Sequence, residues 1–94
     1  MKARVTDDLL EILRSKSRSE RLEIGDAINR VIESWGRPQV HSGSGIRRLT
    51  TTIFECRVGL DDRLAFVFLA TPPELVFFFI GNHDEIQKLI RSFR

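Results

Sequence analysis

Apolar residues in the first part of the chain recur with the spacing of an α-helix. Residues 6–16 begin with a threonine that suits an N-cap and carry one apolar stripe. Ser17 and Glu20 then have the spacing of a capping box, and a second stripe continues to about residue 36. The pattern predicts two helices. We also expect a close packing contact at Gly25, because glycine inside a helix costs about 1 kcal/mol relative to alanine.

The periodicity changes to two after a Gly- and Ser-rich connector at residues 41–45. Apolar and polar residues alternate over 53–58, which is typical of a half-buried strand. The sequence "GLDD" predicts a hairpin into a second strand at 63–69, and "TPPE" predicts a turn into a third at 75–80. That third strand is apolar on both faces, so it should be the most buried. Residues 84–93 carry a helical stripe again.

Together these elements predict an α+β protein with one domain over residues 1–94. Two N-terminal helices are expected to pack on one face of a mainly antiparallel sheet of three to four strands, followed by a C-terminal helix. Residues 2–5 are the candidate for the optional fourth strand, at the sheet edge. We expect all the helices on one face, which would leave the other face of the sheet open.

Composition and charge exclude only a few classes of protein and partner. Hydrophobic content of 41% and charged content of 30% argue against a disordered chain. The net charge of +2 permits a nucleic-acid partner without requiring one. No apolar run approaches the roughly 18 residues that span a bilayer, so we expect no membrane partner and a cytoplasmic location. Cys56 is the sole cysteine and alternates with apolar neighbours, which predicts a core residue and excludes an intrachain disulfide.

Candidate chemistry lies on the polar side of the first strand. Glu55 and Arg57 are two positions apart, so both point away from the N-terminal helices. If the hairpin places Arg57 opposite Arg63, the two guanidinium groups need a counter-charge, from Glu55 or from an anionic ligand. His83 follows the third strand and would lie beside them. Two arginines, a carboxylate and an imidazole suit phosphodiester chemistry.

Each of these residues also has a purely structural interpretation. Glu55 with either arginine forms, in most proteins, a solvated cross-strand ion pair that contributes little stability. His83 and its neighbours can simply cap the last helix, since Asn82 is a common N-cap type. The run "IRRL", which contains Arg47 and Arg48, is typical of a solvated loop.

The sequences "IRRLTTTIFECRVGLDDRLAFVF" and "LVFFFIGNHDEI" carry a resemblance to a known family. Their order of a charged strand residue, "RVG", an arginine that opens the next strand and a closing "GNHDE" resembles the RelE/ParE toxin superfamily of bacterial type II toxin–antitoxin systems. The resemblance covers most of the chain, and it is more specific in the C-terminal half than in the helical half. It implies a RelE/ParE-like fold for the whole domain.

The RNA-cleaving branch of that family implies a metal-independent endoribonuclease without a cofactor, which drives a ribose 2′-hydroxyl onto the adjacent phosphate. By this resemblance Glu55 is the candidate base, Arg57 and Arg63 stabilise charge on the phosphate, and His83 is the candidate acid. The RNA-binding candidates are Arg47, Arg48 and Phe93. The implied partners are messenger RNA, free or on the ribosome, and a cognate antitoxin protein.

Two other functions stay open at this point. The gyrase-poisoning branch of the same superfamily implies a non-catalytic ParE-like inhibitor of DNA gyrase that acts through its surface. A non-toxic accessory domain of the same fold is the third interpretation. Messenger RNA decay on expression would favour the endoribonuclease, and a DNA damage response would favour the gyrase inhibitor.

Overall fold

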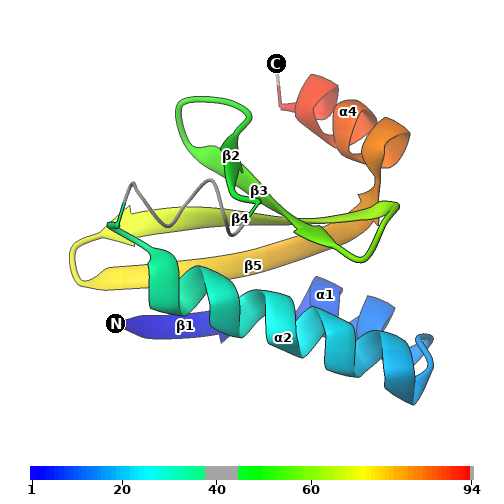
Figure 1. Cartoon of the computed structure of the whole chain (residues 1–94). Helices are drawn as coiled ribbons and strands as arrows, with labels where there is room; N and C mark the ends of the chain where they lie inside the picture. The colour runs from blue at the N-terminus through cyan, green and yellow to red at the C-terminus, as the bar shows by residue number, and fades with distance from the viewer. Residues whose placement is uncertain (38–44, 94) are drawn as a thin grey trace.

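The computed structural model describes residues 1–37 and 45–93. Most of the expected connector therefore lies outside the described residues. The fold is α+β, as the sequence predicts (Figure 1). In chain order the elements are β1 (Lys2–Val5), α1 (Asp7–Arg14), α2 (Arg18–Ser34), β2 (Arg47–Arg48), β3 (Ile53–Val58), β4 (Asp62–Ala70), β5 (Pro73–Asn82) and α4 (His83–Ser92). None of the helices in the described ranges is both long and apolar enough to cross a membrane.

Within the described residues the sheet has five strands in the order β1-β5-β4-β3-β2. Three of the four pairings are antiparallel, and β1 runs parallel to β5 at one edge. The optional strand at the N-terminus is therefore present. The fifth strand, β2, exceeds the three to four that were expected, because a two-residue strand is too short to show any periodicity.

Helices α1 and α2 pack on one face of the sheet and enclose the larger core. Leu9, Ala27 and Val31 of these helices are fully buried against β3, β4 and β5. At one end of this core Trp35 meets a cluster of phenylalanine rings, with its centroid 4.9 Å from that of Phe54. The alternating pattern of β3 supplies the strand side of the interface, and Cys56 is buried there as expected.

Helix α4 covers the opposite face, so the expectation that all helices share one face is wrong. Its Ile86 and Ile90 pack against Ile53 and Ala65 in a second, smaller core. The physical reason lies in β5, where a register shift opposite Ala65/Phe66 leaves Phe78 as an extra residue. Both Phe78 and Phe79 consequently pack into the second core, which gives α4 an apolar surface to bury. The third expected strand, predicted to be apolar on both faces, is thus covered on both.

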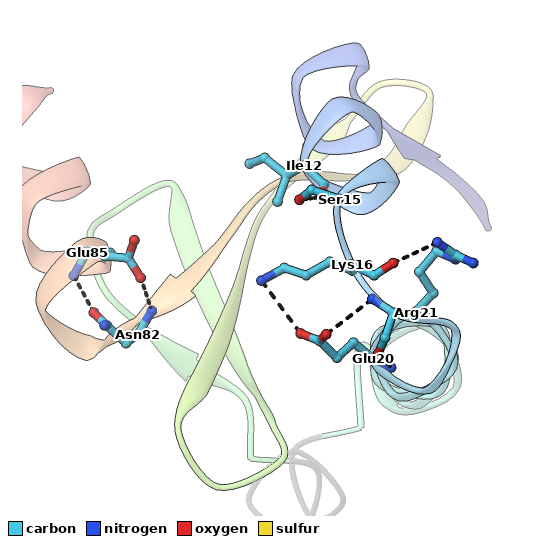
Figure 2. Close-up of polar contacts among 8 residues, drawn as sticks. Ile12, Ser15, Lys16, Glu20, Arg21, Asn82 and Glu85 are labelled. Atoms are coloured by element: carbon cyan, nitrogen blue, oxygen red, sulfur yellow. Dashed lines mark hydrogen bonds and ion pairs between the residues drawn. The ribbon is translucent and has the colours of Figure 1, made fainter.

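Side-chain caps fix where the helices begin. Thr6 accepts from the backbone of Leu9 at the start of α1, and Ser17 forms a complete capping box with Glu20 at the start of α2. Figure 2 shows the equivalent reciprocal pair at α4, where Asn82 and Glu85 each accept the other's backbone N–H at 2.9 and 2.8 Å. Each box satisfies two N–H groups that the first helical turn leaves without partners.

Two glycines behave differently from expectation. Beyond its chain neighbours and the backbone of its own helix, no atom lies within 4 Å of the place where a Cβ would stand on Gly25, so the expected close contact there is absent. At Gly81 a Cβ would lie 2.9 Å from Cβ of Glu85 and 2.9 Å from Cε2 of Phe79. The position that requires glycine is therefore the junction of β5 and α4, where the first helical turn folds back onto the strand.

Candidate functional site

The sheet register brings most of the candidate residues together on the face that α4 partly covers. Arg57 on β3 lies directly opposite Arg63 on β4, which is the pairing that the sequence argument required, and Arg63 lies opposite Gly81 on β5. On the other side of β3, Arg47 of β2 is paired with Glu55. The four charged residues therefore occupy neighbouring positions on three adjacent strands. We call Arg47, Glu55, Arg57 and Arg63 the arginine cluster.

Glu55 lies at the centre of the cluster and is only 3% exposed. Its Oε1 is 3.1 Å from Nη2 of Arg47 and 3.9 Å from Nε of Arg63. The solvated cross-strand pair considered from the sequence therefore does not describe Glu55, since a buried carboxylate needs charged partners to offset the loss of hydration. Arg47 keeps 63% of its side chain exposed while it makes this contact.

Arg57 is the exposed member of the cluster. Its guanidinium makes no ion pair with any residue that the structure describes, although its backbone carbonyl accepts from Nη2 of Arg30 at 3.0 Å. Among the described residues the cluster thus sets three guanidinium groups against one carboxylate. Because like charges that face each other across a strand pair repel, the excess positive charge favours an anion between Arg57 and Arg63.

His83 begins α4, two residues beyond the glycine that faces Arg63. The capping box of Asn82 and Glu85 fixes this helix start, and the absence of a side chain at Gly81 lets it approach the sheet. The imidazole is exposed and belongs to the first turn of a helix, where backbone N–H groups also attract anions. Asn82 is the N-cap, as its residue type predicts, and His83 is the first residue of α4.

The three RNA-binding candidates lie in different surroundings. Arg47 belongs to the arginine cluster, whereas Arg48 faces the other side of the sheet and stacks its guanidinium 5.1 Å from the ring centroid of Phe54. Phe93 follows α4, is 60% exposed and meets Phe78 edge to face with 6.4 Å between centroids. The structure therefore brings Arg47 to the cluster, separates Arg48 from it, and places Phe93 near the far end of α4.

The arrangement can bind an anion through Arg57 and Arg63 and has an imidazole at a neighbouring helix start for proton transfer. Sequence reasoning did not foresee that Arg47 pairs with Glu55, because β2 is too short to be recognised as a strand. The doubled arginine of "IRRL" was the available signal, since alternate residues of a strand face opposite sides. In comparisons with known proteins, no family model, no curated protein and no solved structure matches this chain.

Proposed function

We propose that the protein is a metal-independent endoribonuclease and the toxin component of a type II toxin–antitoxin module, with a RelE/ParE-like fold. The observation that carries the proposal is the opposed pair Arg57 and Arg63 beside His83, with more positive charge than Glu55 balances among the described residues. Guanidinium groups bind phosphate oxygens in pairs, and a phosphodiester supplies the missing negative charge.

In the proposed reaction the ribose 2′-hydroxyl attacks the adjacent phosphorus. Glu55 accepts the hydroxyl proton while the new O–P bond forms, and His83 donates a proton to the 5′-oxygen while its bond to phosphorus breaks. Arg57 and Arg63 bind the phosphate oxygens on which negative charge accumulates. The products are a 2′,3′-cyclic phosphate and a free 5′-hydroxyl, so no water is consumed in this step.

The burial of Glu55 makes a further demand on this mechanism. Only 3% of Glu55 is exposed, so its carboxylate can approach a substrate hydroxyl only after a neighbouring side chain moves. Arg47 is the neighbour suited to move, since its side chain is largely exposed and its strand has only two residues. A substrate phosphate that attracts Arg47 would therefore also uncover the proposed base.

The proposed partners follow from the same surface. Messenger RNA, free or on the ribosome, is the proposed substrate, and Arg47 and Phe93 are the proposed RNA contacts beyond the scissile phosphate. An antitoxin with an acidic segment would cover the exposed arginines and inhibit the site. The proposed location of this activity is the cytoplasm.

The test is cleavage of single-stranded RNA by purified protein, with the ends of the products identified. Removing a general acid typically lowers a rate about 100-fold or more, so His83→Ala should lower the cleavage rate by that factor. Arg57→Ala and Arg63→Ala should abolish growth arrest on expression. Arg14→Ala is the matched control, because Arg14 is an exposed arginine of α1 that pairs with Glu11 away from the cluster. Wild-type rates in His83→Ala, Arg57→Ala and Arg63→Ala alike would refute the proposal. Intact RNA with a DNA damage response in expressing cells would favour the gyrase-directed alternative.

A further inference from the structure

A groove of about 620 Å³ opens on the same face of the sheet as the arginine cluster. One wall is the loop at residues 49–52 between β2 and β3, and the other is the C-terminal part of α4 with Phe93. The floor consists of Ile53, Val67, Val76 and Phe78 from three adjacent strands. The groove is therefore built from the sheet face that α4 does not fully cover.

The lining combines a flat apolar surface with free hydroxyl groups. The hydroxyl of Thr50 already holds the loop together, since its Oγ1 accepts from the backbone N–H of Thr52 at 3.2 Å and of Ile53 at 3.0 Å. The hydroxyls of Thr51 and Thr52 are exposed and make no hydrogen bond to any residue that the structure describes. The ring of Phe93 is 60% exposed at the groove. An aromatic ring beside unpaired hydroxyls suits a flat ligand that carries hydrogen-bonding groups on its edge.

The groove and the arginine cluster lie on the same face of β3. Ile53, Glu55 and Arg57 are alternate residues on one face of this strand, so the groove floor and Arg57 are about 13 Å apart at 3.3 Å per residue. Between Ile53 and Arg57 this face of β3 carries Glu55, which is 3% exposed and paired with the exposed Arg47, so a ligand that joins the groove to Arg57 passes over Arg47. A ligand that fills the groove and also reaches Arg57 with an anionic group must be extended. Such a ligand has a flat ring in the groove, a few phosphates along its backbone from the phosphate at Arg57.

We propose that the groove binds one nucleobase of a single-stranded RNA whose scissile phosphate lies between Arg57 and Arg63. This inference rests on the proposed function. It adds to that function the residues that select the base of the substrate. Phe93 stacks on the base, and the hydroxyls of Thr51 and Thr52 contact its edge. Stacking accepts any base, whereas the hydroxyls discriminate by the donors and acceptors that each edge presents.

The test uses a short 2′-O-methyl RNA, which is not cleaved because its attacking hydroxyl is blocked, with the fluorescent base 2-aminopurine placed at each position in turn. Wild-type protein should quench the fluorescence at one position, a few nucleotides from the phosphate that would be cleaved in unmodified RNA. Phe93→Leu should remove that quenching and weaken binding about tenfold, in line with the loss of one stacked base. Thr51→Val should change the ranking of oligonucleotides that differ at that position alone.

Leu22→Ala is the matched control, because Leu22 is also 60% exposed but belongs to α2 on the other face of the sheet. It should leave quenching and affinity unchanged. If Phe93→Leu and Thr51→Val bind and quench as the wild type does, while Arg57→Ala still abolishes binding, the groove proposal fails and the proposed function stands. If the wild type binds no oligonucleotide, both fail. If Phe93→Leu instead disrupts self-association in sedimentation and leaves RNA binding intact, a second copy of the chain occupies the groove and the proposal is overturned.

Discussion

Cys56 is a buried thiol whose environment favours its neutral form. The pKa of this thiol is raised from 9.0 to about 12, mainly by burial; the charge of Arg30 opposes the shift and the charge of Glu55 adds to it. The unfolded chain loses the thiol proton from about pH 9, whereas the folded protein keeps it. The contribution of Cys56 to stability is therefore complete below pH 9 and decreases as the pH rises towards 12.

A urea titration at pH 8 and pH 10 tests this pH dependence. Between pH 8 and pH 10 the free energy of unfolding should fall by about 1.4 kcal/mol more in the wild type than in Cys56→Ala. This difference arises because pH 10 lies one unit above the thiol's ordinary pKa. Equal losses in both proteins would contradict the prediction. In the folded wild type the thiol should also resist labelling by a disulfide reagent at pH 8, since the thiolate is the reactive form.

Individual residues of the site were predictable to the extent that strand alternation and hairpin pairing determine them. The alternation of β3 predicts that Glu55 and Arg57 share a face, and the short "GLDD" turn predicts that Arg57 faces Arg63. The burial of Glu55 was not predictable from its own strand. It depends on Arg47, which reaches Glu55 from an edge strand that has no recognisable pattern.

At the scale of elements, the junction between β5 and α4 controls how close the helix start lies to the sheet. We expect Gly81→Ala to reduce the free energy of unfolding by about 1–3 kcal/mol, because the added methyl group would overpack against Glu85 and Phe79. Gly25→Ala is the counterpart in α2, where the new methyl group meets no atom within 4 Å beyond its chain neighbours and the backbone of its own helix. It should stabilise the protein by about 1 kcal/mol through helix propensity. Thermal and urea unfolding of both variants measure the difference, and a destabilised Gly25→Ala or a neutral Gly81→Ala would contradict it.

The two capping boxes allow stability and catalysis to be separated. Loss of an N-cap side chain costs about 1 kcal/mol, so Asn82→Ala and Ser17→Ala should destabilise the protein to a similar extent. Only Asn82→Ala frees the helix start that carries His83. Under the proposed function it should therefore lower the cleavage rate severalfold more than Ser17→Ala does, measured well below the melting temperature of both variants. Equal rates would show that the position of His83 does not matter for cleavage.

Elements with a long periodic pattern were predictable, and short or irregular ones were not. Residues 18–34 and 53–58 have clear helical and strand periods, and the structure has α2 and β3 there. The side of the sheet that α4 covers depends on the extra residue at Phe78 in β5, which appears only when β4 and β5 are paired. A bulge changes which face a run of apolar residues presents, and nothing in the run "FFF" alone indicates it.

At the scale of the whole molecule, the fold separates a face covered by two helices from a face that is only partly covered. Helices α1 and α2 bury the larger core on one face, and α4 covers only part of the other (Figure 1). The uncovered part carries the arginine cluster and the groove. The α+β class follows from the order of the elements, but this division follows from packing between segments far apart in the sequence, which local patterns do not encode.

The net charge of +2 is small, so RNA affinity under the proposed function should depend on where the charges lie and not on their sum. Each phosphate neutralised on a single strand changes the slope of log affinity against log salt by about 0.7. Arg57→Gln should therefore flatten that slope by about this amount. Arg4→Gln removes the same charge at the opposite edge of the sheet, where Arg4 lies 3.2 Å from Glu74, and should leave the slope unchanged. Titrations of an uncleavable RNA at several salt concentrations provide the measurement. Equal flattening by both variants would mean that RNA responds to the overall charge of the protein, and the arginine cluster would then lose its special role in binding.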